Sequence, residues 1–171
     1  MTGYVQVYTG DGKGKTTAAL GLIVRACGAG LRVYLGQFIK GRKSGEIETL
    51  RTRFPDVTVA QYGRGGFIKS TPSPADIRAA RTGLAEFRKA MLGGDYDLLI
   101  ADEIHCAVSA HLLSVEDVLD LIARKPRQVE LVLTGRGADD RVIARADLVS
   151  DVRAVKHYYD AGVKARKGID R

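Results

Sequence analysis

A glycine-rich segment near the start of the chain constrains its fold more than any other feature. The segment reads Thr-Gly-Asp-Gly-Lys-Gly-Lys-Thr-Thr over residues 9–17. It follows an apolar run at 4–8 and precedes a stretch at 18–23 with the apolar periodicity of a helix. A glycine-rich turn between a strand and a helix directs several backbone N–H groups, together with the positive end of the helix dipole, at one point. The pattern predicts a phosphate-binding loop.

The side chains of this segment indicate its ligands. Lys15 is placed to reach the outer phosphates of a nucleotide, and the Thr16 hydroxyl is placed to bind Mg²⁺. The common spacing has a glycine five positions before Gly14, where this chain has Thr9, and the loop contains an additional lysine, Lys13. A glycine-rich turn without a ligand is the alternative. The residues expected to contact ATP are Thr9, Gly10, Asp11, Gly12, Lys13, Gly14, Lys15, Thr16 and Thr17.

The composition predicts one globular domain over residues 1–171. Hydrophobic residues make up 45% of the chain, which is enough for a full core at this length. No apolar run approaches the roughly 20 residues of a membrane span, and the first residues lack a signal-peptide pattern. The two cysteines, Cys27 and Cys106, are too few for a disulfide framework. We therefore expect a cytoplasmic protein with no membrane partner.

The net charge of +7 raises the question of nucleic-acid binding. The basic residues are, however, spread along the chain and interleaved with acidic ones. Those at 78–89 lie on the polar face of one expected helix, where charges are usually solvated. Anionic small molecules such as nucleoside triphosphates explain part of the charge equally well. We therefore do not expect nucleic acid as a partner.

Apolar runs and helical segments alternate along the chain, which predicts an α/β fold with a mostly parallel sheet and helices on both faces. Several expected strands are apolar at every position, as in sheets covered on both sides. With its phosphate loop, the arrangement is P-loop NTPase-like, of the RecA type. Strands are expected at 4–8, 33–38, 57–62, 98–101, 129–134 and 148–149. Helices are expected at 16–29, 46–53, 74–92, 114–124 and 139–146.

Charged residues follow three of the expected strands. Asp102 and Glu103 end the fourth, and the carboxyl ends of parallel strands line the ligand crevice. We expect both, with Thr16, to hold Mg²⁺ or Mn²⁺; an exposed pair without a ligand is the alternative. Arg136 lies between two glycines after the fifth strand, where a guanidinium can bind phosphate oxygens of ATP. Lys40 follows the second strand, and a surface role explains it as well as a ligand role.

These motifs together resemble those of the P-loop ATP:corrinoid adenosyltransferases. The resemblance includes the phosphate loop, the stretches 37–41 and 134–137, the acidic pair 102–103 and the tail 155–170, and it covers nearly the whole chain. It implies transfer of the 5′-deoxyadenosyl group of ATP to the Co(I) of a reduced corrinoid, with release of triphosphate, in adenosylcobalamin biosynthesis or salvage. A P-loop ATPase or kinase of another specificity is the alternative.

The implied chemistry assigns roles to the basic residues. Co(I) is already a strong nucleophile, so the protein must orient C5′ and neutralise the departing triphosphate. We therefore expect Lys13, Lys15 and Arg136 to be the catalytic residues. The resemblance also implies that ATP lies in the loop in the direction opposite to that in kinases.

The resemblance further implies the partners and a corrinoid site. The substrate is expected to be cob(I)alamin, cobinamide or cobyrinic acid a,c-diamide, with a flavoprotein as reductant and a homodimer as the active form. Phe67 matches the first of two aromatic residues that the family places after the third strand, but the chain contains no tryptophan to match the second. His105 and Cys106 replace a polar–aromatic pair. We expect Tyr62, Phe67 and His105 to contact the corrinoid.

Overall fold

The computed structural model describes residues 2–39, 41, 44–64 and 71–170. Six strands form one sheet: β1 (Val5–Thr9), β2 (Val33–Gln37), β3 (Val57–Gln61), β4 (Leu98–Asp102), β5 (Glu130–Thr134) and β6 (Leu148–Asp151). Their order in the sheet is β3-β2-β4-β5-β1-β6, and every neighbouring pair is parallel. The predicted parallel sheet is therefore confirmed.

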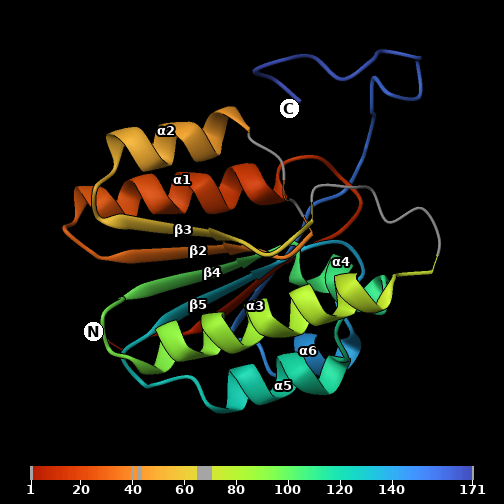
Figure 1. Cartoon of the computed structure of the whole chain (residues 1–171). Helices are drawn as coiled ribbons and strands as arrows, with labels where there is room; N and C mark the ends of the chain where they lie inside the picture. Colours follow the sequence, from red (N-terminus) through yellow and green to blue (C-terminus); the bar gives the residue numbers. More distant parts are fainter. Residues whose placement is uncertain (1, 40, 42–43, 65–70, 171) are drawn as a thin grey trace.

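Helices cover both faces of the sheet, as predicted. They are α1 (Lys15–Gly28), α2 (Gly45–Arg53), α3 (Pro74–Leu92), α4 (Ile104–Ser109), α5 (Val115–Ala123) and α6 (Asp140–Ile143). Figure 1 shows α1 and α2 on one face and α3, α5 and α6 on the other. Within the described part of the chain, no helix is both long and apolar enough to cross a membrane.

The strands are apolar at nearly every position because a hydrophobic core lies on each side of them. Ile23 of α1 and Ile100 of β4 are fully buried in the core on the α1–α2 face. Phe87 of α3 and Leu99 of β4 are fully buried in the core on the opposite face. Burial of one such side chain contributes about 1.5–3 kcal/mol to the free energy of unfolding. Alternate residues of β4 thus attach helices to both faces.

Capping residues begin α3 and α5. The Ser114 hydroxyl accepts a hydrogen bond from the Asp117 N–H at 3.1 Å, and the Asp117 carboxylate accepts one from the Ser114 N–H at 2.8 Å. Ser73 and Asp76 form the same reciprocal pair at the start of α3, where Pro74 occupies the first helical position. Each pair satisfies N–H groups that a helix terminus leaves without partners.

Two elements differ from the predictions. Helix α4 was not expected, because its six residues follow β4 directly and are too few to show helical periodicity. Helix α6 is shorter than the helix predicted at 139–146. The reason is that the Asp147 N–H donates to the Val5 carbonyl at 2.8 Å, so the chain must already be extended beside β1 at that point.

The strand order brings three connections together at the carboxyl edge of the sheet. Strand β5 lies between β1, which precedes the phosphate loop, and β4, which ends in Asp102. The loops after β1, β4 and β5 are therefore neighbours. The segment 152–170 leaves β6 at the same edge and turns back toward the phosphate loop (Figure 1). Any site built from these loops lies at one end of the molecule.

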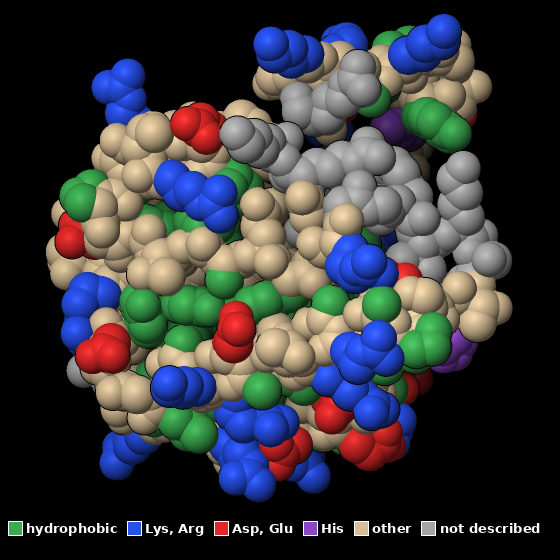
Figure 2. Space-filling model, in the orientation of Figure 1, with side chains coloured by type: hydrophobic (Ala, Val, Ile, Leu, Met, Phe, Trp, Pro, Cys, Tyr) green, Lys and Arg blue, Asp and Glu red, His purple; other side chains and the backbone are tan. Residues whose placement is uncertain are grey.

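Charged side chains are distributed over the surface. In the view of Figure 2, Lys and Arg side chains form several separate groups, most of them beside Asp or Glu. On α5, the Asp120 carboxylate accepts a hydrogen bond from Arg124 at 2.7 Å and forms an ion pair with Arg88 of α3 at 2.8 Å. Asp120 thus pairs with cations from two helices.

Candidate active site

The phosphate loop connects β1 to α1 in a conformation that depends on glycine. Gly10 and Gly14 have φ angles of 94° and 128°, which residues with a Cβ rarely adopt. Helix α1 begins at Lys15, has no acidic residue in its first turn, and is preceded by a residue without a side chain to cap it. The positive end of a 14-residue helix is thus not neutralised by a side-chain cap. An anion is the ligand that such a terminus favours.

Lys15 lies inside the loop and is almost completely buried. Its ammonium donates hydrogen bonds to the carbonyl oxygens of Gly10 at 2.5 Å and Gly12 at 2.7 Å. Burial, and secondly the charge of Arg136, hold the pKa of Lys15 below its ordinary value. The two cations therefore lie close enough to repel each other, and a bound anion would reduce that repulsion.

The other residues of the loop differ in exposure. The Thr9 hydroxyl is buried and accepts a hydrogen bond from the Ala138 N–H at 3.2 Å, which connects the loop to the segment after β5. Asp11 and Thr17 are exposed. Lys13 is half-exposed, and its ammonium contacts Asp170 of the carboxyl-terminal segment at 2.6 Å. The loop is thus held from two sides, by the segment after β5 and by the chain terminus.

Asp102 at the end of β4 is completely buried. Its Oδ1 accepts hydrogen bonds from the hydroxyls of Thr16 at 2.9 Å and Thr134 at 2.7 Å. Its Oδ2 accepts one from the Gln37 amide at 2.9 Å. A buried carboxylate requires such donors because it has lost its water. The structure thus brings Asp102 to the first turn of α1, next to Lys15.

Asp102 belongs to a row of polar side chains that crosses the sheet. The amide of Gln61 on β3 donates to the Gln37 side chain on β2 at 3.0 Å, and Gln37 in turn donates to Asp102. Gln37 lies opposite both Gln61 and Asp102 in the strand register. No role is predicted for Gln37 or Thr134 from the sequence. The available signal was that each is a polar residue directly after an uncharged, mostly apolar run at the end of its strand.

Glu103 follows Asp102 in a left-handed conformation with φ 61°, which is uncommon for a residue with a side chain. Its N–H donates to the Thr134 hydroxyl at 3.0 Å. Burial, and secondly a hydrogen bond with Glu103, raise the pKa of the Cys106 thiol to about 12. The thiol therefore stays protonated at neutral pH and can donate to the Glu103 carboxylate. The backbone and Cys106 together hold Glu103 at the crevice, close enough to act on the pKa of Lys15.

Arg136 is exposed at the end of β5, across from the phosphate loop. Its N–H donates to the Cys106 sulfur at 3.2 Å. A Cβ at Gly135, whose φ is 136°, would lie 2.9 Å from the Cys106 nitrogen, so a glycine is needed for α4 to approach β5 here. This close packing places Arg136 near Lys15, as its effect on the Lys15 pKa indicates.

The donor set beside the loop fits a magnesium ion. The Thr16 hydroxyl and the carboxylates of Asp102 and Glu103 offer oxygen atoms, which Mg²⁺ prefers. The buried Asp102 carboxylate directs Oδ1 at the Thr16 hydroxyl, so a cation bound by Thr16 would lie next to a negative charge that is already oriented. Mg²⁺ commonly takes its remaining ligands from phosphates and water.

The corrinoid candidates are placed differently from the expectation. Tyr62 is buried in the core, with its ring 5.1 Å from that of Phe38 and its hydroxyl 2.7 Å from that of Tyr34. A Cβ at Gly83 of α3 would lie only 2.2 Å from the Tyr62 ring, so this tyrosine is tightly enclosed. It presents little surface to a ligand in this conformation. Phe67, like Lys40, lies outside the described residues.

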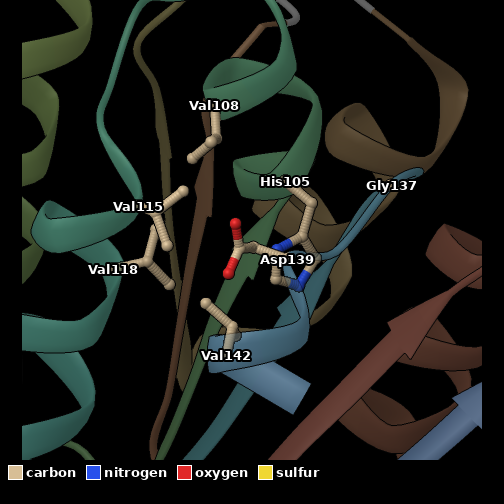
Figure 3. A pocket seen from close by; sticks show the side chains of 7 residues that line it. All are labelled: His105, Val108, Val115, Val118, Gly137, Asp139 and Val142. Carbon is tan, nitrogen blue, oxygen red and sulfur yellow. The ribbon is translucent and has the colours of Figure 1, made fainter. Parts of the chain in front are cut away.

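His105 lines a pocket that contains no residue of the phosphate loop. Figure 3 shows its ring in a small pocket between α4, α5 and α6, beside Asp139 and four valines. The ring is buried, its Nε2 has no hydrogen-bond partner among the described residues, and burial lowers the pKa of His105 to about 4. As with Tyr62, direct contact with a corrinoid would require a rearrangement.

A parallel sheet with a glycine-rich loop before α1 and an acidic strand end two strands away defines a nucleotide-binding protein of the P-loop class. A solved structure of the RadB recombinase shares this fold, with a TM-score of 0.53 over 86% of this chain and 73% of that one, at 13% identity. The predicted RecA-like architecture is therefore confirmed.

The chain belongs to the ATP:corrinoid adenosyltransferase family BtuR/CobO/CobP, whose model matches residues 1–170. The corrinoid adenosyltransferase of Escherichia coli K12 is 38% identical over 98% of this chain and 85% of its own length. The corrinoid adenosyltransferase of Pseudomonas aeruginosa is 35% identical over 98% of this chain and 83% of its own length. The corrinoid adenosyltransferase CobA of Salmonella typhimurium is 38% identical over 98% of this chain and 85% of its own length. The predicted family and enzyme class are confirmed, and an ATPase or kinase of another specificity is not favoured.

Proposed function

We propose that the chain uses the phosphate loop, Arg136 and Mg²⁺ to transfer the 5′-deoxyadenosyl group of ATP to the Co(I) of a reduced corrinoid. In this reaction the C5′–O bond breaks, its electron pair leaves with the triphosphate, and a cobalt–carbon bond forms. The observation that supports the proposal most directly is the grouping of Lys15 and Arg136 at the uncapped start of α1. Cations at this point stabilise the charge that develops on the leaving group.

The substrate itself supplies the nucleophile, so the protein contributes position and charge. Transfer requires cobalt, C5′ and the leaving oxygen to lie in line. With the triphosphate in the cradle, C5′ would face the crevice between the ends of β1, β4 and β5. We assign Lys13, Lys15 and Arg136 to the triphosphate, because Lys13 and Arg136 lie on loops at this edge of the sheet and Lys15 begins α1 there.

The metal ligands are a separate part of the proposal. Thr16 would bind Mg²⁺ directly, Asp102 would orient Thr16 and accept from metal-bound water, and Glu103 would complete the oxygen set. Bound Mg²⁺ offsets negative charge on the phosphate oxygens. The existing contact between Thr16 and Asp102 supports this assignment, because it places the hydroxyl and a buried charge 2.9 Å apart.

The remaining assignments come from the family resemblance. They are a corrinoid contact at Phe67, a flavoprotein reductant, a homodimer and a cytoplasmic location. The physiological corrinoid would be cob(I)alamin, cobinamide or cobyrinic acid a,c-diamide, and comparison of turnover on these three substrates would identify it.

The proposal is tested by mixing the protein anaerobically with ATP, Mg²⁺ and chemically reduced cobalamin. We expect the Co(I) absorbance to disappear while adenosylcobalamin and inorganic triphosphate form in equal amounts. Release of ADP with phosphate, and no cobalt–carbon bond, would instead favour the kinase or ATPase alternative. Removal of Mg²⁺ with a chelator should prevent the formation of both products, which tests the metal assignment.

A further inference from the structure

The carboxyl-terminal segment 152–170 is attached to the phosphate loop at both of its ends. The Gly12 N–H donates to the Val152 carbonyl at 2.7 Å. At the other end, the Lys13 ammonium donates to the Asp170 carboxylate at 2.6 Å. Two consecutive residues of the loop thus hold the start and the finish of the segment, which turns back over the loop between them (Figure 1).

The first attachment depends on glycine. A Cβ at Gly12 would lie 2.7 Å from the Val152 carbonyl oxygen and 2.8 Å from that of Arg153. Gly10 faces the same problem, because its Cβ would lie 2.5 Å from the Val152 oxygen. The loop glycines therefore allow the backbone after β6 to approach, in addition to any phosphate.

The second attachment is a cluster around Asp170, whose side chain is only 11% exposed although it is close to the chain terminus. Oδ1 accepts hydrogen bonds from Lys13 and from the Tyr158 hydroxyl. Oδ2 accepts from the backbone N–H of Arg166 at 3.0 Å and from its Nε at 3.1 Å. The Arg166 guanidinium also lies 4.8 Å from the centre of the Tyr158 ring. Lys13 is the largest of the influences that hold the pKa of Asp170 below its ordinary value.

The cluster is positively charged as a whole, because one carboxylate joins two cations. The segment 152–170 has five basic and two acidic residues, so its attachment adds positive charge beside the loop. Lys13 donates to Asp170 and to the Ile169 carbonyl at 2.5 Å, which uses two of the three N–H donors of an ammonium. The Tyr158 hydroxyl also forms a side-chain hydrogen bond with Lys13, so the ammonium is held by several groups of the carboxyl-terminal segment.

We propose that Asp170 is a positioning residue for triphosphate binding, which fastens the carboxyl-terminal segment to Lys13 and holds Lys13 and Arg166 beside the phosphate loop. Lys13 lies between two glycines, and a long side chain on such a loop would lose considerable freedom on binding a phosphate. Asp170 imposes that order before ATP arrives. The inference rests on the proposed function, in which the triphosphate occupies this loop.

The test measures binding of Mg·ATP and of inorganic tripolyphosphate by calorimetry. We expect Asp170→Asn to weaken both by about tenfold, the size expected for one charge-assisted contact. Binding should be unchanged by Asp170→Asn in a Lys13→Met background, because the effect acts through Lys13. Asp170→Glu keeps the charge and should therefore retain most of the affinity that Asp170→Asn loses.

A matched control is Asp120→Asn on α5, which also removes a carboxylate that binds arginine but lies away from the loop. This variant should bind both ligands normally. Unchanged or tighter tripolyphosphate binding by Asp170→Asn would overturn the inference, as would equal weakening in the Lys13→Met background. Adenosyl transfer to pre-reduced cobalamin by the unmodified chain, measured in parallel, tests the proposed function separately.

Discussion

Lys15 is the residue on which the proposed chemistry depends most. Its ammonium is satisfied by two loop carbonyls in the structure, so a nucleotide must provide better acceptors to displace them. Phosphate oxygens do so, because hydrogen bonds between charged groups are roughly twice as strong as those between neutral ones. This exchange would keep Lys15 hydrogen-bonded throughout and would place its positive charge beside the leaving group.

We therefore predict that Lys15→Ala and Thr16→Ala each lower turnover at least ~100-fold, the usual cost of losing one transition-state contact. The measurement is the rate of triphosphate release with saturating ATP and pre-reduced cobalamin. Lys89→Ala, which removes an equivalent charge from the last turn of α3, serves as the control and should have no effect. A normal rate for Lys15→Ala would exclude the loop from the mechanism.

His105 predicts a dependence of stability on pH. Its pKa is about 4 in the folded chain but about 6.5 when unfolded, so the unfolded state binds more protons between these values. The free energy of unfolding should therefore fall as the pH is lowered, by about 2 kcal/mol from this residue between pH 7.5 and 5. Urea unfolding at the two pH values measures it, and His105→Phe should lack this part of the decrease. An equal decrease in the variant would contradict the prediction.

At the scale of secondary structure, the sequence was informative wherever one pattern extended over many residues. The periodicity of α3 and the apolar runs of β2 and β4 predicted both ends of each element to within one residue. Helix α4 could not be found this way, since it starts immediately after a strand and its first residue follows the left-handed Glu103.

The site was predictable only in part, for a related reason. The phosphate loop and the pair Asp102–Glu103 are contiguous motifs, so their chemistry can be read directly from the chain. The hydrogen bonds from Gln37 and Thr134 to Asp102 depend on strand order, in which β2 and β5 flank β4. The order of the strands in the sheet is not predicted by any local pattern in the sequence. Contacts between strands that are distant in the chain therefore had to come from the structure.

The capping pairs allow a prediction for a single helix. Ser114→Ala removes the acceptor for the Asp117 N–H at the start of α5 and should lower the free energy of unfolding by about 1 kcal/mol. Activity should be unchanged, because the side-chain hydrogen bonds at Ser114 are made with Asp117 and not with a residue of the proposed site. Chemical denaturation and the adenosyl-transfer assay measure the two effects. Loss of activity with normal stability would mean that α5 has a role not described above.

For the whole molecule, the carboxyl edge of the sheet is both the proposed site and a point where distant parts of the chain meet. The Thr16–Asp102 hydrogen bond joins α1 to β4, and the Lys13–Asp170 ion pair joins the first loop to the last residues. A ligand bound at this edge would therefore contact elements from both ends of the sequence. Its binding energy should oppose unfolding of the entire chain rather than of one loop.

We accordingly predict that Mg·ATP stabilises the whole chain against heat. At 100 times the dissociation constant, a ligand that binds only the folded state adds about 2.7 kcal/mol, which corresponds to a rise in Tm of roughly 5–11 °C for a protein of this size. A chelator should remove most of the rise, because the proposed Thr16–Asp102–Glu103 site then lacks its metal. Lys15→Ala should abolish it, whereas Lys89→Ala should retain it. An equal rise in Lys15→Ala would contradict the proposed cradle, since loss of its buried lysine should weaken the binding of ATP there.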